Sequence, residues 1–76
     1  MAPPMSVADT LELLTDQELD QMKRRAWVRA ARAWQDCRTS HLSNVVRLMI
    51  SNEAYSEEQF VNACIREQSR RREIST

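Results

Sequence analysis

Apolar residues recur at intervals of three or four between residues 15 and 38, with polar residues in the positions between them. This spacing is typical of one face of an α-helix, whereas a half-buried strand would alternate apolar and polar residues. Half of this face is alanine, so a second backbone can approach it closely. Its members are Leu19, Met22, Ala26, Ala30, Ala33 and Cys37. We therefore predict a helix over 15–38 that packs along a neighbouring helix.

The polar residues 39–41 interrupt this pattern, which then restarts in a second apolar run. The run comprises Leu42, Val45, Val46, Leu48, Met49 and Ile50. It predicts a helix over 42–52 on the far side of a short turn, so that the first two helices form a hairpin. Asn52 can adopt the left-handed backbone conformation in which many helices end. We expect the second helix to stop there.

Two capping boxes predict the starts of the first and third helices. In a capping box a hydroxyl accepts a hydrogen bond from the amide three residues later, and the side chain of that later residue accepts one in return. Thr15 and Glu18 can form the first box, and Ser56 and Gln59 can form the second. The third helix is accordingly predicted over 56–72.

Residues 1–14 make an acidic segment ahead of a single helical domain that we predict over 15–76. Within this segment Val7, Leu11 and Leu14 would share one face if the chain were helical. The segment is therefore predicted to be either flexible or a short N-terminal helix.

Composition supports an all-α fold and leads to a prediction about assembly. The chain has no glycine, and its only two prolines are Pro3 and Pro4. Glycine is the usual residue of tight β-turns and bulges, which a helical chain does not need. A domain of 76 residues buries only about 60% of the surface of its unfolded chain. We therefore predict an all-α, three-helix fold whose core is completed by forming a homodimer.

The formal net charge of zero conceals an uneven distribution along the chain. Residues 1–20 carry five acids and no base, which gives −5, whereas residues 21–47 carry seven bases and one acid, which gives +6. The sequence has neither a membrane-spanning apolar run nor the layout of a secretory signal. We expect a cytoplasmic protein.

Catalytic and metal-binding chemistry is not favoured by the residues present. Cys37, His41 and Cys64 are the only cysteine and histidine residues in the chain, and they lack the paired spacing of a structural zinc site. A nucleophile would need a base, an orienting group and an oxyanion hole, and no glycine-rich loop is available for the last of these. We expect no enzyme activity, no metal and no cofactor, with both cysteines reduced.

Arginine and tryptophan are concentrated on the first predicted helix. These residue types often carry the binding energy of protein interfaces, and the same combination occurs on nucleic-acid-binding surfaces. The neutral chain and the acidic segment upstream favour a protein partner. The predicted partner-binding residues are Arg24, Arg25, Trp27, Arg29, Arg32 and Trp34.

In its size, lack of glycine and charge-segregated helical layout, the chain resembles the small helical accessory proteins of phages and prophages that bind and inhibit host machinery. The resemblance implies an inhibitor or regulator that occupies a surface on a larger host protein. Our first hypothesis is such a protein-binding module. The alternative is a small DNA- or RNA-binding regulator that uses the basic band of the first helix.

Overall fold

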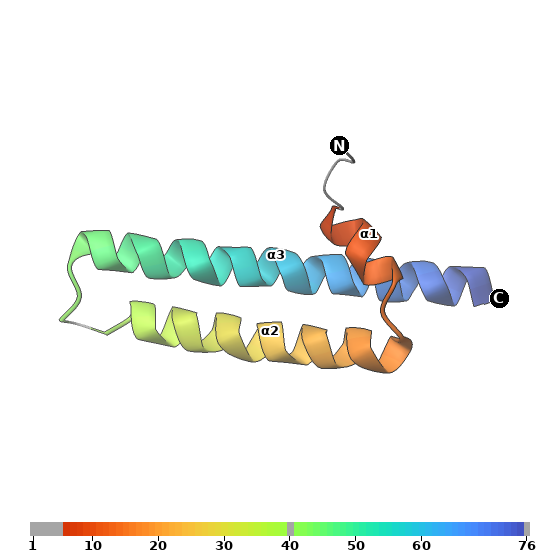
Figure 1. The fold of residues 1–76 in the computed structure, drawn as a ribbon. Helices are drawn as coiled ribbons and strands as arrows, with labels where there is room; N and C mark the ends of the chain where they lie inside the picture. Colours follow the sequence, from red (N-terminus) through yellow and green to blue (C-terminus); the bar gives the residue numbers. More distant parts are fainter. Residues whose placement is uncertain (1–5, 40, 76) are drawn as a thin grey trace.

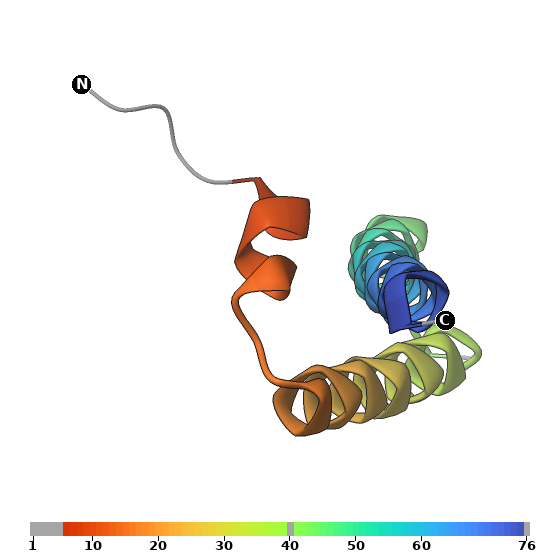
Figure 2. The ribbon, with the colours of Figure 1, turned by 90° about the vertical axis from the view of Figure 1, so that its right-hand side faces the viewer.

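Three helices make up the computed structural model, which describes residues 6–39 and 41–75. They are α1 (Val7–Glu12), α2 (Asp16–Cys37) and α3 (Asn44–Ser75). Helices α2 and α3 lie side by side as an antiparallel hairpin, and α1 lies beside the carboxyl-terminal half of α3 (Figure 1). Viewed from the end of the hairpin, α1 and α3 stand on the same side of α2 (Figure 2). The all-α prediction of a long hairpin with a short N-terminal helix is confirmed.

The molecule is elongated because only one end of the hairpin is covered by a third helix. Its Cα radius of gyration is 15.5 Å, whereas a compact domain of this length has a radius of about 11 Å. At the covered end a small core joins all three helices through Leu11, Leu19 and Cys64. The other end is two helices thick, so large side chains there have no third element to bury them.

The predicted break between the second and third helices is wrong. Residues 44–52 of the predicted second helix and residues 56–72 of the predicted third belong to one uninterrupted helix, α3, and Ser56 lies within it and does not cap it. Residues 51–56 contain neither proline nor glycine, so the backbone can remain helical. Ala54 is fully buried against α2 in the middle of this segment. A helix cap at Ser56 would contribute only about 1 kcal/mol to stability. Packing of α3 against α2 on both sides of Ala54 outweighs this contribution.

The other predicted helix starts are present. The Thr15 hydroxyl accepts from the Glu18 amide at 3.1 Å, and the Glu18 carboxylate accepts from the Thr15 amide at 2.9 Å. These two hydrogen bonds lower the pKa of Glu18. Ser6 and Asp9 form a second capping box at the start of α1. The short-helix prediction for the N-terminal segment is thus confirmed over Val7–Glu12, and the part that concerns residues 1–5 lies outside the described residues.

Close packing of α2 on α3 rests on three buried alanines, Ala26, Ala30 and Ala54, which we call the alanine seam. Large buried side chains flank the seam, namely Leu19 of α2 and Val61 of α3. The predicted apolar face of the first helix is confirmed at its centre, where Leu19 and the two seam alanines of α2 are buried, whereas Met22 at its margin is exposed. Small residues allow the two helix backbones to approach, so there is little room between them for larger groups.

The two cysteines are both free. Cys64 is fully buried in the three-helix core, where burial raises the pKa of its thiol. It therefore remains protonated and packs as a small apolar side chain. Cys37 is half-buried near the end of α2, and its Sγ lies 3.6 Å from the carbonyl oxygen of Arg47.

Arg71 of α3 holds the turn between α1 and α2 in place. Its guanidinium donates to the carbonyl oxygens of Leu11 at 3.0 Å and Leu14 at 2.7 Å, and its Nη1 pairs with Asp16 at 2.7 Å. Two of these partners are backbone carbonyl oxygens, one in the last turn of α1 and one in the turn that follows it. One side chain thus links the end of α1 and the start of α2 to α3.

Glu67 orients Arg71 from one helical turn away. Its carboxylate is only 7% exposed and pairs with Arg71 at 3.3 Å and with Arg70 at 2.6 Å. The hydrogen bonds from Arg70, supported by those from Arg71, lower the pKa of Glu67 from 4.5 to about 2. The carboxylate is therefore charged in the folded protein throughout the neutral and mildly acidic range.

The alanine seam predicts a sharp difference between two adjacent residues. Ala30→Leu places three extra carbons between α2 and α3, and we expect it to destabilise the fold by about 1–3 kcal/mol. Ala31 is exposed on the same helix, so Ala31→Leu should change stability by less than about 0.5 kcal/mol. Urea denaturation followed by circular dichroism measures both. Equal stability of the two variants would show that the seam does not bring the helices into close contact.

The Glu67 pair predicts a stability change in acid. Because the pKa is lowered in the folded state, the charged carboxylate stabilises the fold above pH 4.5, and this contribution disappears as the pH falls towards 2. Glu67→Gln should therefore lower the melting temperature at pH 7 and flatten the decline of wild-type stability between pH 4.5 and 2. Glu53→Gln removes an exposed carboxylate from the same helix and is the matched control. Identical pH profiles for wild type and Glu67→Gln would contradict this role.

Candidate protein-binding surface

One edge of the hairpin carries an apolar groove of about 480 Å³ between α2 and α3. It is lined by Lys23, Arg24, Trp27, Val28, Val61 and Ile65, and we call it the Trp27 groove. Polar contacts between the helices lie towards both ends of the groove. The indole Nε1 of Trp34 donates to Glu58 at 2.7 Å, and Nζ of Lys23 donates to Gln68 at 2.9 Å. These contacts fix the separation of the two helices on either side of the groove.

Trp27 is exposed because of its position relative to the alanine seam. It follows Ala26 directly, which turns its side chain about 100° away from the seam around the helix axis. The space between the backbones suits alanine, so the indole lies outside it and is 62% exposed. Val28 and Ile65 are also exposed, whereas Val61 is buried beneath them. The result is a continuous apolar surface built from both helices.

The mouth of the Trp27 groove has positive charge. Arg24 pairs with Asp20 at 2.9 Å, and Lys23 lies 3.5 Å from the same carboxylate. One acid thus faces two cations, and the groove residues themselves include no acid. An apolar surface beside excess positive charge suits a partner that carries apolar and acidic residues together.

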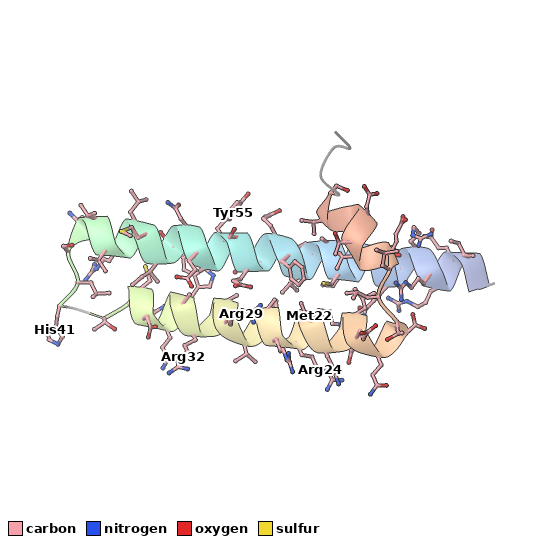
Figure 3. All side chains as sticks on the ribbon, viewed as in Figure 1. Met22, Arg24, Arg29, Arg32, His41 and Tyr55 are labelled. Atoms are coloured by element: carbon pink, nitrogen blue, oxygen red, sulfur yellow. The ribbon has the colours of Figure 1, made fainter. Side chains whose placement is uncertain are left out.

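The predicted binding residues do not form one surface. Arg24 and Trp27 both line the Trp27 groove, whereas Trp34 is half-buried by its bond to Glu58. On the opposite edge Arg29 lies between the helices and makes a two-point pair with Glu57, at 3.0 and 3.3 Å. Figure 3 shows Arg24 and Arg32 extending away from α3, in contrast to Arg29.

Arg25 and Arg32 are exposed on α2 and make no ion pair with another residue of the described chain. They lie outside the Trp27 groove. The arginines that periodicity grouped together therefore differ in their surroundings. Two of them, Arg24 and Arg29, already face a carboxylate, and only Arg24 borders the Trp27 groove.

Sequence reasoning missed the part of the groove that α3 contributes. Val61 and Ile65 are not among the predicted binding residues, and Ile65 is exposed beside Trp27. The exposed Val28 also lay outside the predicted set. Which residue of α3 lies opposite Trp27 depends on the antiparallel register of the hairpin. The sequence pattern predicts the faces of the helices but not that register.

A second exposed apolar surface lies on the amino-terminal half of α3. Val45, Leu48 and Met49 belong to the apolar run that predicted the second helix. Together with Tyr55 they are exposed, because no other helix of the described residues covers this side of α3. Tyr55 points away from α2 (Figure 3). We call Val45, Leu48, Met49, Asn52 and Tyr55 the α3 stripe.

The remaining hollows are mixed or polar. One of about 410 Å³ is lined by charged groups that include Lys23, Arg71 and Asp16, and Arg71 is already engaged by Asp16 and the end of α1. Within residues 6–39 and 41–75 no three metal-ligating side chains come together. None of the described helices combines the length and apolar character needed to cross a membrane.

Comparison of the chain with protein-family models, with curated proteins and with solved structures gives no match. The function is therefore inferred from the surfaces of the molecule itself.

Proposed function

We propose that this protein is a non-enzymatic protein-binding module that docks through the Trp27 groove onto a larger partner. The observation that carries the proposal is an exposed tryptophan over an apolar groove whose mouth is positively charged. Trp and Arg are the residue types most often found at the energetic centres of protein interfaces. Apolar surface of this kind is most stable when a partner removes it from water.

The partner we expect presents an apolar anchor with acidic residues beside it. The anchor would enter between Trp27 and Ile65, where Val61 forms the floor. Acidic neighbours would meet Arg24 and Lys23 at the mouth. In such an interface the charges raise the association rate and set the orientation, while the buried apolar groups supply most of the affinity.

Binding of this kind would act by covering the partner's surface. The hairpin edge is long and rigid because α2 and α3 support one another along their length. We propose an inhibitor or regulator on these grounds. The resemblance to the small helical accessory proteins of phages points in the same direction.

The alternative function, nucleic-acid binding, draws support from Arg25 and Arg32, which are exposed and available on α2. Against it, the arginines of α2 do not form one basic surface, because Arg29 is paired with Glu57 on the edge opposite the Trp27 groove. A nucleic-acid complex would release counterions and weaken steeply with salt, whereas an apolar-anchored protein complex would depend on salt weakly. The two functions are therefore separated by one salt titration.

The Trp27 groove predicts the effect of a single substitution on partner binding. A partner captured by the wild-type chain from a nuclease-treated lysate of its source organism should bind Trp27→Ala about 30-fold more weakly, the loss typical of a central interface tryptophan. Circular dichroism should show an unchanged helical fold because the indole is largely exposed. Dissociation constants from calorimetry with the purified partner measure the change.

Leu13→Ala is the matched control, since Leu13 is equally exposed but lies outside the groove. Its affinity for the partner should equal that of the wild type. If Trp27→Ala and Leu13→Ala bind alike, the groove is not the docking site. If the wild-type chain binds only a labelled duplex or single strand, and loses it as salt rises, the alternative function is correct.

A further inference from the structure

The α3 stripe is a surface separate from the Trp27 groove. Its residues fall at helical positions 45, 48, 49, 52 and 55, the spacing with which one face of a helix meets another helix. The four apolar members, Val45, Leu48, Met49 and Tyr55, are between 60 and 68% exposed. Asn52, also exposed, is the only polar member and lies within the stripe between Met49 and Tyr55.

No other described helix covers the stripe. Helix α2 packs on the opposite face of α3, where Ala54 and Val61 are buried. Helix α1 reaches only the carboxyl-terminal half of α3, near Ala63 and Glu67. In Figure 1 the amino-terminal half of α3 is bare on the side that faces away from α2, and Figure 3 shows Tyr55 pointing to that side.

We infer that the occupant of the α3 stripe is a second copy of this chain, packed stripe to stripe about a two-fold axis. In such an interface each surface meets itself, so it must be complementary to itself. A surface without charge satisfies this condition, because no like charges are brought together. The stripe contains no charged residue. The Trp27 groove, with two cations at its mouth, does not satisfy it.

The two α3 helices run antiparallel in this arrangement, because α1 obstructs the parallel one. Helix α1 rises beyond the edge of α3 on the side to which Tyr55 points (Figures 1 and 3). A parallel partner helix would pass α1 along the carboxyl-terminal half of α3. In an antiparallel pair centred on the stripe, the α3 helix of the partner begins beside the carboxyl-terminal half of α3 and does not run past α1. Antiparallel helix dipoles add a small favourable contribution.

Asn52 marks the centre of the antiparallel pair. With the two-fold axis at this residue, Met49 of one copy lies opposite Tyr55 of the other, three positions on either side of the axis. The two Asn52 side chains face one another, and an amide carries both a donor and an acceptor, so each can bond to its copy. A central asparagine pair of this kind fixes helix register in coiled coils.

The size of the stripe sets the expected affinity. Its four apolar side chains leave on the order of 300 Å² of apolar surface per copy available for burial. That area is near the largest apolar patch found on ordinary monomers and is small for a permanent dimer. We therefore expect a reversible dimer with a dissociation constant on the order of 10–100 µM.

Sedimentation equilibrium of the full chain tests this association without any partner. The wild type should shift from monomer to dimer as its concentration rises from about 5 to about 500 µM. Leu48→Glu with Met49→Glu should abolish the shift, because dimerisation would then remove four carboxylates from water without a partner charge. Ile74→Glu, which introduces the same charge at an exposed position of the same helix outside the stripe, should leave it unchanged. Circular dichroism checks that each variant remains helical.

Cross-linking tests the orientation. Asn52→Cys should be joined to its copy by a short bis-maleimide, since residue 52 lies on the axis. Val45→Cys should not be cross-linked to its copy, because residue 45 of one chain would lie about 21 Å from residue 45 of the other along the antiparallel helices. The wild type is the control for cross-linking through the native cysteines, Cys37 and Cys64. Efficient cross-linking at both positions would show a parallel pair and overturn the arrangement.

A wild-type chain that stays monomeric at about 500 µM would overturn the inference altogether, whatever the variants do. A dimer that persists in folded Leu48→Glu with Met49→Glu would likewise place the interface elsewhere. Neither result would bear on the Trp27 groove, which is tested with a separate substitution and a separate partner.

Discussion

The close approach of α2 and α3 along the alanine seam determines where the larger side chains of this protein lie. Ala26, Ala30 and Ala54 are buried between the helices, and the space they define does not admit an indole or a long aliphatic group. Trp27 therefore lies at the hairpin edge, and Tyr55 lies on the far side of α3. A chain of this length with so narrow a core keeps much of its apolar surface in contact with water. The binding surfaces we propose follow from that constraint.

The sequence predicted the faces of α2 well because its periodicity reports directly on the seam. Leu19, Ala26 and Ala30 were placed on one buried face, where the structure has them. The error at residues 51–56 arose from reading Ser56 and Gln59 as a local stop-and-start signal. Continuous packing around Ala54, which depends on residues of α2 distant in the sequence, favours an uninterrupted helix.

The candidate site was predicted only in part, for a related reason. Trp27 and Arg24 could be singled out from composition, since they are residue types that interfaces favour. The position of Ile65 in the Trp27 groove could not be predicted from composition, because it depends on the register of α3 against α2. The separation of Arg29 from Arg24 likewise depends on Glu57, which reaches Arg29 only once the hairpin has formed. Charge along the chain indicated a basic region but not which arginines were already paired.

The central claim is that α2 and an unbroken α3 are held together by the alanine seam, so that the large apolar side chains remain outside it. Amide hydrogen exchange, measured at concentrations low enough to keep the chain monomeric, tests this claim most directly. We predict that the amides of residues 51–56 exchange as slowly as those of residues 57–62, with slow exchange in α2 around Ala30. Exchange at residues 51–56 as fast as in the turn at 41–43 would contradict the account.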